Sequence, residues 1–139
     1  MYSYILNSIW QITVEIARLE DLSEEIRKSR SSKRKREYED NIKWCKEEKE
    51  NMLDKYCPDK IIEKLNLTDD EKKMARLHYI EGMSWSEAYY ETDEYLDFDD
   101  SDMDDEEASK EIKKKYRTHQ RRIERKVNIF NAREKRDDV

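Results

Sequence analysis

The chain has 139 residues with a net charge of −6, and 46% of its residues are charged while 35% are apolar. A typical globular chain has about 25% charged and about 45–50% apolar residues. One glycine and one proline are too few for the turns of an all-β fold, and they exclude a glycine-rich phosphate loop. The apolar stretches are too short for a transmembrane span or a signal peptide, and the two cysteines form no disulfide framework. We therefore predict an all-α fold of long helices in a cytoplasmic protein without a membrane partner.

Residues 1–57 are predicted to form an antiparallel helical hairpin with the seams of a coiled coil. Apolar residues recur at spacings of four and three in a first helix, with Ser23 at the one missed position: Ile5, Ile9, Ile12, Ile16, Leu19 and Ile26. After a polar turn at residues 29–32, a second seam follows, interrupted by Lys49: Tyr38, Ile42, Cys45, Met52 and Tyr56. The same seams would alternatively pair two chains, giving a homodimer.

Residues 58–139 are predicted to form a second unit that begins with a short helix from Pro58 to Leu65. The segment Thr68–Glu71 has the pattern of a capping box, and the helix that it opens ends near Gly82, the only glycine. The segment Ser84–Glu87 repeats the capping pattern and opens another helix. A helix, a turn of about three residues and a second helix are typical of the front half of a helix-turn-helix.

Charge is segregated along this second unit. Residues 77–109 carry 13 acidic residues and no lysine or arginine, whereas residues 110–139 carry 12 basic and five acidic residues. The acidic insertion, residues 91–107, has three interpretations: a disordered solvated loop, a segment that covers the basic helix, or a protein-binding segment with aromatic anchors. Part of it has the spacing of a calcium loop, but Asp105 stands where that loop requires glycine, so we expect no metal site.

The last helix is predicted to run from near Asp104–Ser109 to about Lys135. Its apolar stripe consists of Ile112, Tyr116, Ile123, Val127 and Phe130, and the remainder is largely basic. Lysine and arginine neutralise phosphates, and arginine and glutamine read guanine and adenine edges. The candidate DNA-binding residues are Lys113, Lys114, Arg117, Thr118, His119, Gln120, Arg121, Arg122, Arg125 and Lys126. The alternative is an ordinary solvated helix face.

Two stretches of this unit resemble known regulators. Residues 67–88, LTDDEKKMARLHYIEGMSWSEA, resemble the fourth region of sigma-70-type factors, and more closely the phage and prophage regulators of the RinA and ArpU type. Residues 118–123, THQRRI, are similar to the recognition-helix stretch of the same regulators. In those families the two stretches lie closer together, and here the acidic insertion separates them. The resemblance implies a DNA-binding helix-turn-helix that controls phage transcription.

We therefore expect a phage-type transcriptional regulator that binds double-stranded DNA through its C-terminal basic helix. The alternatives are a factor that binds a protein such as RNA polymerase through the acidic insertion, and a small terminase subunit. His78 and His119 have no metal-ligand pattern around them, and no catalytic grouping stands out, so we expect neither an enzyme nor a cofactor. Trp10, Trp44 and Trp85 are predicted to be core or interface anchors.

Overall fold

The computed structural model describes residues 5–27 and 32–137, with the side chains of residues 5–25 and 34–133. These residues form helices and no strand, which confirms the all-α prediction. The helices are α1 (Ile5–Arg27), α2 (Ser32–Tyr56), α3 (Pro58–Lys64), α4 (Asp69–Tyr79), α5 (Trp85–Tyr90), α6 (Asp93–Leu96) and α7 (Asp105–Asp137). Within the described ranges, none of the helices has the length and apolar character needed to span a membrane.

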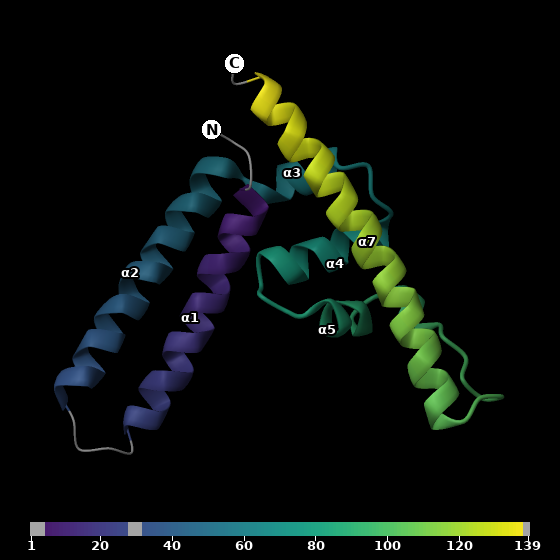
Figure 1. The fold of residues 1–139 in the computed structure, drawn as a ribbon, viewed down its shortest axis with the longest axis horizontal. Helices are drawn as coiled ribbons and strands as arrows, with labels where there is room; N and C mark the ends of the chain where they lie inside the picture. Colours follow the sequence, from purple (N-terminus) through teal and green to yellow (C-terminus); the bar gives the residue numbers. More distant parts are fainter. Residues whose placement is uncertain (1–4, 28–31, 138–139) are drawn as a thin grey trace.

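Helices α1 and α2 lie side by side as the long arm on the left of Figure 1, and α7 forms the second long arm. Along the α1–α2 seam Ile5, Ile9, Leu19 and Cys45 are buried, while Ile12, Ile16, Ile42, Met52 and Tyr56 are partly buried. The side chain of Ile26 and the turn at residues 28–31 lie outside the described residues. Leu6, which the predicted seam omits, is also buried because it packs in the core beside α3 and α4.

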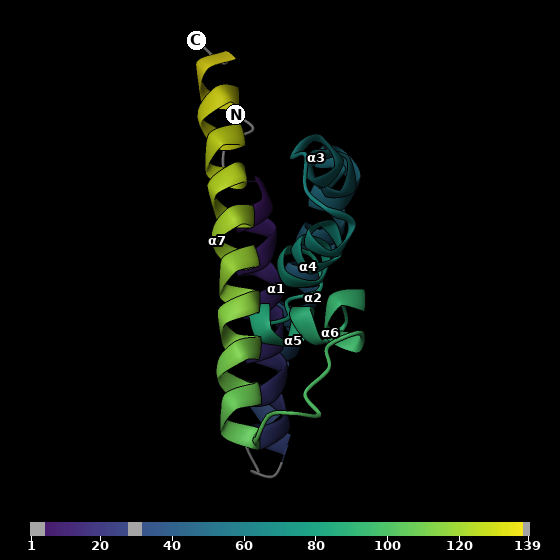
Figure 2. The same ribbon diagram turned by 90° about the vertical axis from the view of Figure 1, so that its right-hand side faces the viewer.

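The hairpin and the second unit share one hydrophobic core. Leu6 and Ile9 of α1 belong to the same buried cluster as Ile62 of α3, Met74 of α4 and Ile123 of α7. The shorter helices α3, α4 and α5 therefore lie between the two long arms (Figures 1 and 2). The division at residue 57 marks a change of element, and the core runs across it.

Lys49, which interrupts the second seam, makes one of the contacts between the hairpin and α4. Its ammonium group donates a hydrogen bond to the carbonyl oxygen of Ile80, at a distance of 2.6 Å. The Thr13 hydroxyl of α1 lies 3.4 Å from the same oxygen. A carbonyl at a helix C-terminus needs a donor from outside the helix. Lys49 of α2 is that donor, because the Thr13 hydroxyl donates its one proton to the Ile9 carbonyl oxygen at 2.7 Å.

The predicted helix starts are largely confirmed. Pro58 occupies the first turn of α3. Thr68 and Glu71 form the complete capping box at α4, with both bonds 3.2 Å long. At α5 the Ser84 hydroxyl accepts from the Glu87 amide at 3.2 Å, whereas the Glu87 side chain is exposed, so the box there is half formed.

Any residue other than glycine would be strained at position 82. Its φ is +80°, and a Cβ added there would lie 2.7 Å from Cγ2 of Thr13. We expect Gly82→Ala to lower the free energy of unfolding by about 1–3 kcal/mol, from the left-handed backbone and the clash together. Urea denaturation measures it. Adding Thr13→Ser removes the clashing methyl group and should recover part of the loss; no recovery would contradict the predicted close contact.

Three aromatic rings connect the hairpin to α4 and α5. The His78 ring stacks between Trp10 and Trp85, with ring centroids 4.1 and 3.8 Å away, and its Nδ1 lies 2.7 Å from the Met83 carbonyl oxygen. Trp10 and Trp85 are therefore anchors at the edge of the core, as predicted. Trp44 does not belong to the core: its side chain is 62% exposed on α2.

Candidate nucleic-acid interface

Helix α7 presents one buried stripe and one exposed basic face. Ile123 and Val127 are completely or almost completely buried, and Ile112, Tyr116 and Phe130 pack against the core beside them. Consecutive residues advance by about 100° around an α-helix, so residues 117, 121 and 125 point away from this stripe. The predicted apolar stripe thus fixes which side of α7 faces solvent.

We call the exposed side the outer face of α7. Its members are all exposed: Lys110, Lys113, Lys114, Arg117, Thr118, Arg121 and Arg125. A shallow groove of about 370 Å³ is lined by the first six of these residues. Within the described part of the chain, the only salt bridge on this face joins Lys110 to Glu106, at 3.5 Å. The outer face is therefore a continuous positive surface with few internal counter-charges.

Four predicted DNA-binding residues are not members of the outer face. His119 is turned toward α4 and α6, where both ring nitrogens are hydrogen-bonded, so the prediction that it belongs to the basic face is wrong. The Gln120 amide donates to the Glu124 carboxylate at 2.9 Å, and Lys126 donates to the Asn66 carbonyl oxygen. Arg122 is exposed but lies 3.9 Å from the carboxylate of Glu71.

His119 bridges two carboxylates from different elements. Its Nδ1 lies 2.9 Å from Glu71 of α4, and its Nε2 lies 2.8 Å from Glu94 of α6. Glu71 is completely buried, and its other oxygen caps the Thr68 amide. A buried carboxylate requires such partners, so this network ties α4 and the acidic insertion to α7.

The charges in the network shift the pKa values of both partners. Burial alone would raise the pKa of Glu71, but the hydrogen bonds from His119 and Thr68 and the positive charge of Arg122 lower it below its ordinary value. Burial also opposes protonation of His119, yet the hydrogen bonds to Glu71 and Glu94 and their negative charges raise its pKa above 6.5. The protonated ring, which donates from both nitrogens, is the form that the two carboxylates favour.

The stabilisation from His119 should therefore depend on pH. A histidine whose pKa is raised by folding stabilises the protein fully below its unfolded pKa of about 6.5, and this stabilisation is lost as the pH rises through the folded pKa. We expect the difference in unfolding free energy between the wild type and His119→Gln to shrink from pH 6 to pH 9, as followed by urea denaturation. A difference independent of pH would contradict the bridging role, and Glu94→Gln should reduce the pH dependence.

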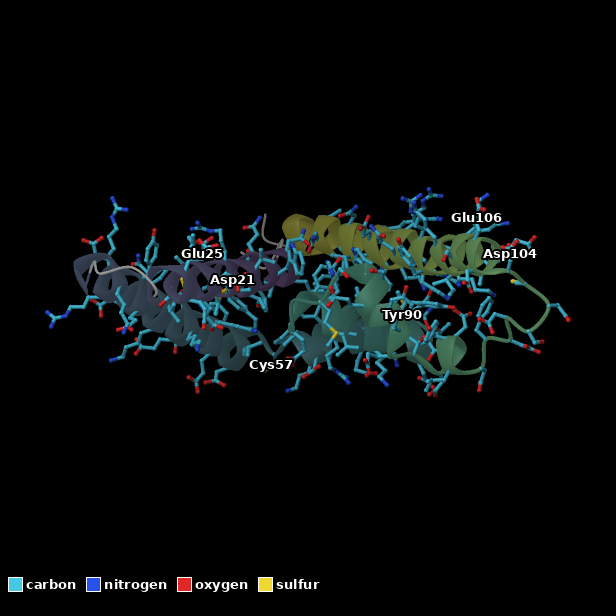
Figure 3. All side chains as sticks on the ribbon, turned by 90° about the horizontal axis from the view of Figure 1, so that it is seen from below. Asp21, Glu25, Cys57, Tyr90, Asp104 and Glu106 are labelled. Carbon is cyan, nitrogen blue, oxygen red and sulfur yellow. The ribbon has the colours of Figure 1, made fainter. Side chains whose placement is uncertain are left out.

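The acidic insertion is partly ordered and leaves the outer face uncovered. It includes α6, whose N-cap Thr92 is completely buried and accepts from the Tyr95 amide at 3.3 Å. Between residues 91–104 and α7, the described residues make a single salt bridge, from Glu94 to His119. His119 lies on the opposite side of α7 from Arg121 and Arg125, so this contact does not neutralise the outer face. Asp104 and Glu106 lie at the end of the molecule away from the hairpin (Figure 3).

Sequence reasoning missed two residues of this region. Lys110 belongs to the outer face, and its spacing of seven residues from Arg117 was a signal for it. Glu71 was recognised only as a capping residue. Its bond to His119 spans 48 positions of sequence, and no local pattern indicates such a contact.

We compared the chain with protein-family models, curated proteins and solved structures. No family model, curated protein or solved structure matches the chain.

Proposed function

We propose that the chain is a DNA-binding transcriptional regulator of the phage type, which contacts double-stranded DNA through the outer face of α7. The observation that carries this proposal is the exposed row of lysines and arginines on that face, which has almost no acidic partner among the described residues. Phosphate groups of DNA are the ligands that such a row neutralises.

The residues around α7 are consistent with a helix that enters the major groove of DNA. The core holds it through Ile123 and Val127, and the order of α4 and α5 is compatible with the front half of a helix-turn-helix, which the resemblance implies. The first turn of α7 carries Asp105, Glu106 and Glu107, which phosphates repel. The contact therefore begins at Lys110, in the second turn of the helix.

Base reading would fall to Arg121 and Thr118. Arginine makes two hydrogen bonds to guanine in the major groove, and threonine contacts several bases. Gln120, the other predicted base reader, is held by Glu124. Arg117 and Lys114 lie one turn closer to the N-terminus on the same face, where they would hold phosphates on either side.

The proposal predicts a steep salt dependence. Fluorescence anisotropy of a labelled DNA duplex, measured from about 50 to 400 mM salt, should give a log–log slope of roughly −4 to −6 if four to six cations replace condensed counterions. A solvated face with no nucleic-acid role predicts no binding at about 50 mM salt. That result would contradict the proposal and favour a protein partner.

A further inference from the structure

Two large apolar side chains of the acidic insertion are exposed, Leu96 and, to a smaller extent, Met103. Leu96, at the end of α6, is 72% exposed, the largest value among the exposed large hydrophobic residues described. Asp93 and Asp97, both exposed, flank it. A lone exposed leucine is ordinary on a protein surface, so a role for Leu96 depends on how firmly it is held and on a complementary surface elsewhere.

The element that carries Leu96 is held firmly. The Thr92 side chain caps α6 and donates to the Tyr89 carbonyl oxygen at 2.6 Å. The Asp93 amide donates to the Asp70 carboxylate at 3.2 Å, and Glu94 binds His119. Tyr95 packs edge-on against Tyr90 with ring centroids 4.7 Å apart. Leu96 is thus presented by a prearranged turn, which lowers the entropy lost on docking.

The same chain carries a groove of matching chemistry. On α7, directly after the basic row, a shallow and wide-open groove is lined by Arg121, Glu124, Arg125, Asn128, Ile129 and Ala132. Ile129 is 44% exposed. The apolar side chains of Ile129 and Ala132 suit a leucine side chain, and the two arginines beside them suit the aspartates that flank Leu96.

Leu96 cannot reach this groove within one molecule. Glu94 of α6 contacts α7 at His119, and Arg121 and Arg125 lie about 160° and 120° away from His119 around the helix. Figure 2 shows α5 between α6 and α7. Residues 77–109 carry 13 acidic residues and no lysine or arginine, so nucleic acid and anionic membranes are repelled from the Leu96 surface.

We propose that Leu96 and its flanking aspartates of one copy dock into the Arg121–Ala132 groove on α7 of a second copy. The contact joins two different surfaces, so it forms either a reciprocal pair or a head-to-tail chain of copies. It uses Arg121 and Arg125, which the outer face would also present to DNA. Self-association and DNA binding therefore compete for the same arginines.

Sedimentation velocity without DNA tests the proposal, at protein concentrations from about 10 µM to 1 mM. The wild type should associate as concentration rises, and association should weaken in about 1 M salt because the ion pairs are screened. Leu96→Asp and Ile129→Asp should each weaken it by at least about tenfold. Val14→Asp, at a 40% exposed position on α1, is the matched control and should change nothing.

Mixing the two variants gives the decisive result. Leu96→Asp keeps an intact groove and Ile129→Asp keeps an intact Leu96, so their mixture should associate more strongly than either variant alone. Circular dichroism confirms that both remain helical. A monomeric wild type at every concentration, association that persists in both variants, or a folded mixture that stays monomeric would each overturn the proposal. DNA titrations at nanomolar protein, far below the concentrations at which copies associate, depend on the cations of α7 and not on Leu96, so failure of DNA binding and failure of self-association are distinguishable.

Discussion

Glu71→Ala is expected to lower the free energy of unfolding by about 3 kcal/mol. The Glu71 side chain is completely buried and accepts from the Thr68 amide and the His119 ring, at 3.2 and 2.9 Å. Removing it leaves the buried Nδ1 of His119 and the first turn of α4 without their acceptor, and it opens a cavity. Urea denaturation followed by circular dichroism measures the change.

Glu87→Ala is the matched control for this variant. Glu87 occupies the same third position of helix α5, but its side chain is exposed. The expected cost is a few tenths of a kcal/mol, because surface substitutions away from a network change stability little. Equal losses in the two variants would show that neither the capping bond to Thr68 nor the bond to His119 adds to the stability of the protein.

The double variant Arg117→Ala and Arg121→Ala is expected to weaken DNA binding by about 10- to 100-fold and to reduce the salt slope by nearly two. Both side chains are exposed on the outer face and have no ion pair within the described residues. Their removal should therefore leave the fold intact and delete two phosphate or base contacts. Anisotropy at a fixed low salt concentration measures the affinity.

A control with the same change in net charge separates local contacts from overall charge. Arg36 and Lys43 are exposed on α2, on the other long arm. Replacing both by alanine removes two positive charges far from α7, and we expect less than about a threefold loss. If the two double variants lose affinity equally, DNA binding depends on total charge and not on the outer face.

Local patterns in the sequence predicted all the described helices except α6, which lies in the acidic insertion. The Thr68 capping box, the left-handed Gly82 and the apolar stripe of α7 each depend on residues within one or two turns, and the structure contains all three. The stripe also predicted which side of α7 is exposed. These features were accessible because helix caps and helical periodicity are short-range properties.

The contacts between elements could not be predicted in the same way. His119 was assigned to the basic face because its neighbours are basic, and it is instead bound by Glu71 and Glu94, which lie 48 and 25 positions away. Lys49 was recognised as a break in a seam, whereas its bond to Ile80 spans 31 positions. Such pairs are determined by how the helices pack, and a single sequence carries no signal for them.

Cross-linking from the outer face tests the central claim most directly. A photoreactive benzoylphenylalanine placed at Thr118, which is exposed on the outer face, should cross-link to a bound DNA duplex on illumination. The same group at Lys43 of α2 should give little or no cross-linked DNA. Cross-links from position 43 and none from position 118 would show that DNA lies on another surface, and the assignment of α7 as the DNA-binding helix would be wrong.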